Sequence, residues 1–169
     1  MQRLVLIVSA VAAFYSAPAL AYCSGRDPTW PGYNADFYTV QSEFKRAKYV
    51  AMVKVEREIW LGEDGKPRPL RPPFRSGISR PWGMDPYIGA FYEVGLVKAY
   101  KGRPARHLRL YSENTTARFW LEPSREYLVF LSEQNFDAPV GTALTIDSCG
   151  NSPVLRRDAG SLLLQLRRF

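Results

Sequence analysis

The chain has little of the chemistry that metal and redox sites need, because it contains one histidine and two cysteines among 169 residues. A structural or catalytic zinc site takes several nitrogen, sulfur or carboxylate ligands. The single histidine, His107, lies in a strand-like pattern near arginines, with no nucleophile motif beside it. We therefore expect no metal site, no cofactor and no catalytic residue. Phosphate-binding glycine loops are missing as well.

Long apolar runs are also scarce. The run from Leu4 to Phe14 is shorter than the roughly 20 residues that a membrane-spanning helix needs, and Pro18 follows it. Arg3 before the run and the small-residue pattern Ala19-Leu20-Ala21 after it match a cleaved secretory signal. We predict that residues 1–21 are removed, that the mature chain has no transmembrane helix, and that the protein is periplasmic or secreted.

The two cysteines, Cys23 and Cys149, are most simply a disulfide in an exported chain. Lipidation of Cys23 is the alternative, but it requires a small residue before the cysteine and Tyr22 is bulky. Because a bridge would close most of the mature chain into one loop, it would contribute on the order of 4 to 5 kcal/mol in the chain-entropy model.

The charge balance is basic. Removing residues 1–21 takes one of the 23 basic residues and none of the 16 acidic ones, which leaves 22 against 16, or +6. Exported proteins seldom meet cellular nucleic acid, so we expect no nucleic-acid partner. An anionic polymer or an anionic membrane surface is an alternative partner to a protein.

The mature chain, 22–169, has the length of one domain and alternates strand-like and turn-like segments. Phe37, Val40, Phe44 and Ala47 recur at helical spacing after Asn34, a possible N-cap. Alternation or branched-residue enrichment then predicts five or six strands, and Asp158 is the expected cap of a last helix. The predicted elements are a helix over 35–47, strands over 49–60, 88–100, 107–111, 126–131 and around 144–146, and a helix after 158. This pattern favours a small, closed, mainly β structure.

The 49–60 segment alternates apolar and polar residues over its second half. Val53, Val55 and Arg57 fall on one parity of the 49–60 segment, and Lys54, Glu56 and Glu58 fall on the other. Strict alternation would therefore place the carboxylates of Glu56 and Glu58 on one solvated face.

The least regular segment is a Pro/Arg-rich insertion over 62–87, which also contains aromatic residues. Connections of this length are usually functional or disordered. Two interpretations stay open, a partner-contact loop and a solvated insertion whose aromatics fold over the domain. The contact interpretation predicts partner-binding residues Trp60, Arg68, Arg71, Phe74, Arg75, Arg80 and Trp82.

The order of parts is recognisable: an early cysteine, a helix ending near Ala47, strands ending in Lys101-Gly102 and Leu131, and Ile146-Asp147-Ser148-Cys149-Gly150-Asn151-Ser152. It resembles bacterial proteins related to the tissue inhibitors of metalloproteinases, a netrin-like group. The resemblance implies an OB-like, closed or partly closed antiparallel barrel of five to six strands with an N-terminal and a C-terminal helix.

In the animal inhibitors of that group, a terminal cysteine within a Cys-x-Cys opening chelates the protease zinc. Here Tyr22 precedes Cys23, and Gly25 stands where the second cysteine would be. We therefore predict a non-catalytic exported module that binds a protein of the envelope or the exterior. The alternatives are a polyanion or glycan binder that uses the basic insertion and, less favoured, a protease inhibitor.

Overall fold

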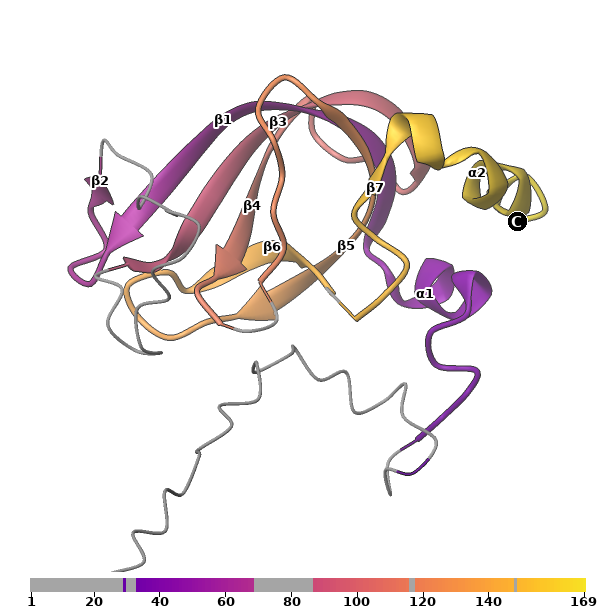
Figure 1. Cartoon of the computed structure of the whole chain (residues 1–169), viewed down its shortest axis with the longest axis horizontal. Helices are drawn as coiled ribbons and strands as arrows, with labels where there is room; N and C mark the ends of the chain where they lie inside the picture. Colours follow the sequence, from indigo (N-terminus) through magenta and orange to yellow (C-terminus); the bar gives the residue numbers. More distant parts are fainter. Residues whose placement is uncertain (1–28, 30–32, 69–86, 116–117, 148) are drawn as a thin grey trace, which may run out of the picture.

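The computed structural model describes residues 29, 33–68, 87–115, 118–147 and 149–169. It is mainly β with two short α-helices, as predicted (Figure 1). The elements are α1 (Val40–Arg46), β1 (Tyr49–Gly62), β2 (Pro67–Arg68), β3 (Tyr87–Lys101), β4 (His107–Glu113), β5 (Glu126–Asn135), β6 (Thr142–Ile146), β7 (Val154–Leu155), the 3₁₀ turn η2 (Arg156–Asp158) and α2 (Gly160–Leu166).

Hydrogen bonds run in a ring through five strands, in the order β1–β3–β4–β6–β5 and back to β1. We call this the five-strand ring. The pairing of β4 with β6 is parallel and the other four pairings are antiparallel. The short strands β2 and β7 extend the sheet from β1 and β5.

Apolar side chains fill the inside of the ring, because alternate residues of each strand point inward. The fully buried members include Val53, Val94, Leu110 and Val129. Phe119 and Leu121, which follow β4 in an irregular segment, are buried in the same cluster.

A second apolar cluster covers the outside of β1 and β5. Val50 and Met52 of β1 and Leu128 and Phe130 of β5 point away from the interior and pack with residues of α1 and α2. Both faces of 50–53 in β1 and of 127–131 in β5 are therefore buried, and this explains why these two stretches are continuously apolar. Figure 1 shows α1, α2 and the C-terminus together at one end of the sheet, and β2 at the other.

The prediction that Arg57 shares a face with Val55 is wrong, because β1 carries a β-bulge between them. Val55 pairs with Val94 and Arg57 pairs with Glu93, so Glu56 is an extra residue in the ladder. Val55 is buried while Arg57 is exposed. Glu58 is half-buried and accepts a hydrogen bond from the buried Tyr92 hydroxyl at 2.9 Å, so Glu56 and Glu58 do not form a carboxylate pair on one face.

The helix caps also differ from the prediction. Thr39, not Asn34, is the N-cap of α1, and its hydroxyl accepts the Ser42 N–H at 3.2 Å. Asn34 instead accepts the Asp36 N–H in the preceding turn. Asp158 lies in η2, and Ala159 is the N-cap of α2 without a side-chain bond.

Part of the predicted insertion belongs to the sheet. The chain turns back after β1 with hydrogen bonds from Gly65 N to Gly62 O and from Gly62 N to Lys66 O. Pro67 and Arg68 then pair with Leu61 and Trp60 as β2. Since β3 begins at Tyr87, the segment between the two strands is 69–86. Within the described residues, none of the helices has the length and apolar character needed to cross a membrane.

Candidate functional site

Three of the predicted site residues lie in the described structure. Trp60 is 5% exposed and packs in the interior of the ring, so its ring presents almost no surface to a partner. Arg68 is exposed, and its guanidinium donates to Asp64 Oδ1 at 3.0 Å. Cys149 lies in the turn after β6. The other predicted residues lie outside the described residues: Cys23, Arg71, Phe74, Arg75, Arg80 and Trp82.

Aromatic side chains cluster near the end of β1 and the start of β3, around Trp60. The Trp60 ring packs against Tyr87 and Trp120, with centroids 5.6 Å away in both cases. The Arg118 guanidinium lies 4.6 Å from the centre of the Trp120 ring. We call Trp60, Tyr87, Arg118 and Trp120 the aromatic rim. Tyr87, Arg118 and Trp120 are half-buried, so each keeps part of its surface in contact with solvent.

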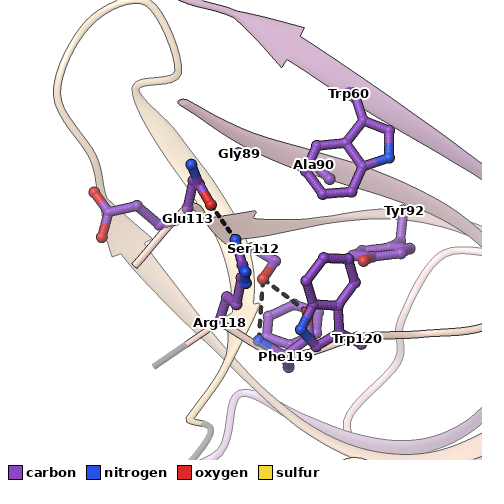
Figure 2. A pocket seen from close by; sticks show the side chains of 10 residues that line it. Trp60, Gly89, Ala90, Tyr92, Ser112, Glu113, Arg118, Phe119 and Trp120 are labelled. Atoms are coloured by element: carbon purple, nitrogen blue, oxygen red, sulfur yellow. Dashed lines mark hydrogen bonds between the residues drawn. The ribbon is translucent and has the colours of Figure 1, made fainter. Parts of the chain in front are cut away.

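The rim borders a shallow hollow, which Figure 2 shows between Trp60 and Trp120 on one side and Arg118 and Ser112 on the other. Its volume is about 180 Å³, including space open to solvent. Pockets for drug-sized ligands usually measure about 300 to 1,000 Å³. The hollow is therefore too small to enclose such a ligand.

Hydrogen bonds hold the segment that carries Trp120. The buried Ser112 hydroxyl accepts the Phe119 N–H at 3.2 Å and donates to the Phe119 carbonyl at 3.0 Å. Asn114 Nδ2 donates to the Tyr87 carbonyl at 2.8 Å, and Arg118 donates to Asn114 Oδ1. Asn114 begins an Asn-x-Thr pattern, but its side-chain nitrogen is already used to join β3 to the end of β4.

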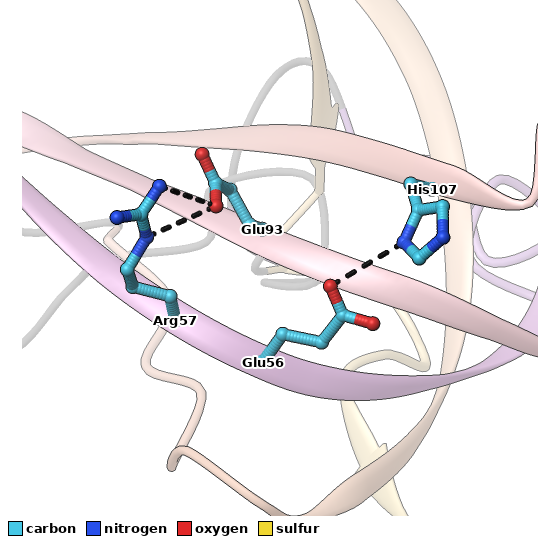
Figure 3. Close-up of polar contacts among 4 residues, drawn as sticks. All are labelled: Glu56, Arg57, Glu93 and His107. Atoms are coloured by element: carbon cyan, nitrogen blue, oxygen red, sulfur yellow. Dashed lines mark hydrogen bonds and ion pairs between the residues drawn. The ribbon is translucent and has the colours of Figure 1, made fainter.

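Two ion pairs lie on the outside of the sheet, as Figure 3 shows. Arg57 donates twice to Glu93 Oε2, at 3.0 and 2.8 Å, and His107 Nδ1 lies 3.4 Å from Glu56 Oε2. The side chains of His107 and Glu56 are 67% and 46% exposed. Exposed pairs of this kind contribute about 0 to 1 kcal/mol each, which makes them ordinary surface pairs.

A buried carboxylate joins α1 to the turn that contains Cys149. Glu43 is 5% exposed. Its two oxygens accept the Asn151 backbone N–H at 3.0 and 2.8 Å, and Oε2 also accepts from Asn151 Nδ2 at 2.7 Å. Asn151 Nδ2 donates as well to the Tyr38 carbonyl at 2.7 Å. We call these contacts the Asn151 clasp. It holds the turn from Asp147 to Ser152 against α1, and the predicted bond from Cys149 to Cys23 would add a second tie there.

The clasp predicts a specific pH dependence. Burial raises the pKa of Glu43 above its ordinary value of 4.5, and the nearby Asp147 charge acts in the same direction, although the bonds from Asn151 oppose both. The folded state therefore holds this proton more tightly than the unfolded state, so the Glu43 contribution to stability falls as pH rises through 4.5 to the higher folded pKa.

Replacement of Glu43 by glutamine removes this titration. We expect the difference in unfolding free energy, wild type minus variant, to be largest at about pH 4 and to decrease toward about pH 7. Urea unfolding across this range measures it. Parallel pH profiles for the two proteins would contradict a raised Glu43 pKa.

Comparisons with models of known protein families and with curated proteins find no match to this chain. Its site is therefore interpreted from its own residues.

Sequence patterns missed most of the aromatic rim. Trp60 and Trp120 are far apart in the chain, and only the folded ring brings them together. A weaker signal is present in the sequence: Trp120 lies in the short apolar stretch 119–121, between Phe119 and Leu121, which are both buried in the structure.

Proposed function

We propose that this protein is a non-catalytic exported module that binds another protein through the aromatic rim, and that its five-strand ring is an OB-type barrel. The OB fold is a small, partly open Greek-key barrel of five strands. In chain order the ring strands are β1, β3, β4, β5 and β6, and β6 lies between β4 and β5. This closed ring, with a last strand inserted between two earlier ones, supports the OB assignment.

The aromatic rim is the observation that carries the binding proposal. Tryptophan, tyrosine and arginine dominate the energetics of protein interfaces, where they cluster in well-packed and desolvated positions. Here two tryptophans, a tyrosine and an arginine pack within one group, and Ser112 and Asn114 fix the backbone around it. Such a surface is already ordered before binding, so little side-chain entropy is lost on association.

The position of the rim links it to the predicted contact loop. The described residues on either side of 69–86 are Arg68, which pairs with Trp60, and Tyr87, which packs on Trp60. The rim therefore stands at both ends of segment 69–86. We propose that the contact surface includes this segment and the rim, with Trp120 and Arg118 as its ordered anchors and Trp60 as their support.

The proposal that the protein is exported rests on the signal-like residues 1–21, and the proposed Cys23–Cys149 disulfide agrees with it. In an oxidising compartment this bond would join the start of the mature chain to the turn held by the Asn151 clasp.

Affinity capture with crosslinking from the native envelope tests the binding proposal. The bait variants are Trp120→Ser, Arg118→Gln and a replacement of 69–86 by a short Gly/Ser linker. We expect the first variant to lower recovery of the specific partner about 30-fold or more, since interface anchors contribute about 2 kcal/mol or more.

Arg125→Gln is the matched control, because Arg125 is exposed and its guanidinium forms a surface ion pair with Glu122 at 3.4 Å. Thermal unfolding of each bait shows that it is folded. Recovery of the same partner in equal yield by wild type, Trp120→Ser and Arg118→Gln would exclude the rim as the binding surface.

A further inference from the structure

The end of the molecule formed by α1, α2 and the C-terminal residue exposes several large apolar side chains. Phe37, Leu164 and Phe169 are 41%, 62% and 53% exposed. The Phe169 ring packs on Phe44 of α1 with centroids 5.1 Å apart, Phe37 packs against Arg46 of α1, and α2, which carries Leu164, contacts α1. Figure 1 places both helices and the C-terminus side by side at this end. We call it the helical end.

Basic residues surround these apolar side chains. Arg167 and Arg168 follow the last residue of α2, Leu166, and both are exposed, as is Leu164 within the helix. In α1, Lys45 and Arg46 are exposed in the last turn, and the Arg46 guanidinium lies 3.6 Å from the centre of the Phe37 ring.

Acidic residues do not balance this charge. The sequence from Ala159 to Phe169 contains none. Of the nearby acids, Glu43 is buried in the Asn151 clasp and Asp158 pairs with Arg157 at 3.3 Å. Asp36 before α1 and Asp147 near Glu43 are exposed, two acids against the four exposed basic residues Lys45, Arg46, Arg167 and Arg168. The helical end is therefore a basic surface with apolar side chains between its cations.

We propose that the helical end docks on an anionic lipid bilayer, with Leu164, Phe169 and Phe37 in the headgroup layer and the surrounding cations on the lipid phosphates. Protein interfaces concentrate apolar side chains in a core that is depleted of charge. Here the exposed Leu164, Phe169 and Phe37 lie instead at an end of the molecule that also exposes several cations, and basic and apolar side chains together suit the interface of an anionic bilayer. Arginine stems can lie along the apolar layer while their guanidinium groups reach the phosphates.

This docking leaves the aromatic rim accessible. Trp60 of the rim pairs with β2, and Figure 1 places β2 at the opposite end of the sheet from α1 and α2. A protein held on a membrane by its helical end would present the rim away from the lipid. The membrane proposal does not depend on the protein-binding proposal, because the two use different residues.

Cosedimentation with vesicles tests the proposal on the protein purified after export. The probes are vesicles of phosphatidylcholine alone and vesicles with about one quarter phosphatidylglycerol. We expect binding to the anionic vesicles only. In Arg167→Gln/Arg168→Gln the vesicle affinity should fall about 30-fold, because each basic residue near an anionic surface contributes about fivefold.

A second variant, Leu164→Ser/Phe169→Ser, tests the apolar contribution. In wild type, part of the binding should survive high salt, which screens the charges, and this variant should lose that part. The controls are Arg125→Gln and Val97→Thr, which change an exposed arginine and a 45% exposed apolar residue outside the helical end.

Two results would overturn the proposal. One is equal binding to both kinds of vesicle or to neither. The other is a loss of affinity in Arg125→Gln as large as in Arg167→Gln/Arg168→Gln, which would mean that net charge alone drives the association. Neither result bears on partner capture by Trp120, so the two proposals fail separately.

Discussion

Replacement of Asn151 by alanine is expected to lower the free energy of unfolding by about 3 kcal/mol, because it removes a charge-assisted bond and leaves a buried carboxylate short of donors. The side chain of Asn151 donates to Glu43 Oε2 at 2.7 Å and to the Tyr38 carbonyl at 2.7 Å. Glu43 is 5% exposed, so water cannot easily replace the lost donor. Urea unfolding at neutral pH measures the change.

Asn135→Ala is the matched control. Asn135 accepts a side-chain hydrogen bond from the Thr142 hydroxyl at 2.6 Å. Unlike Asn151, it is exposed, at the end of β5. We expect this control to change stability by about 0.5 kcal/mol or less. Equal effects of the two substitutions would show that the burial of Glu43 does not matter. In Asn151→Asp, a second carboxylate would face Glu43, so the loss should exceed that of Asn151→Ala at neutral pH and diminish in acid.

Most of the strands could be predicted because successive residues of a strand alternate between the buried and the exposed face, so apolar residues recur at every second position. The segments around Val53, Val94 and Val129 alternate or run apolar over enough residues to identify a strand without knowledge of its partners. The bulge at Glu56 could not be predicted, because it depends on β3. Gly95 of β3 leaves space there, since a Cβ at that position would lie 2.6 Å from Glu56 Oε1.

The predicted helix start, at 35, lies five residues before the observed start at Val40 for a similar reason. Asn34 and Thr39 are both good N-cap types, and the local pattern does not choose between them. The choice depends on tertiary contacts, because Val40 and Glu43 are the first residues of the segment that the rest of the molecule buries. A cap is thus predicted from residue type, but its position is set by packing.

The candidate site was only partly accessible from sequence. Composition predicts Trp60 and the insertion as a contact region, and in the structure Trp60 is buried and packs on Tyr87 and Trp120. Trp120 and Arg118 join it through the closure of the ring. The Asn151 clasp was also missed, because a polar pair 108 positions apart leaves no local pattern.

The ammonium group of Lys101 caps the C-terminal end of α1 by donating hydrogen bonds to backbone carbonyls there. Its Nζ donates to the carbonyls of Phe44, Lys45 and Ala47 at 2.5, 2.8 and 2.7 Å. The last carbonyls of a helix have no partner within the helix, and a cation there also interacts favourably with the helix dipole. One lysine of β3 therefore attaches α1 to the sheet.

We expect Lys101→Met to lower the free energy of unfolding by about 2 kcal/mol, since methionine keeps the apolar stem but leaves these half-buried carbonyls without their donor. Lys98→Met is the matched control, because Lys98 is exposed on the same strand, with its Nζ 5.1 Å from the centre of the Tyr100 ring. It should change stability by about 0.5 kcal/mol or less. Hydrogen exchange adds a local readout: the Ala47 amide, which donates to the Glu43 carbonyl at 2.8 Å, should exchange faster in Lys101→Met alone. Unchanged protection of that amide would mean that α1 is held by its apolar contacts with α2 and β5, and that the lysine cap is dispensable.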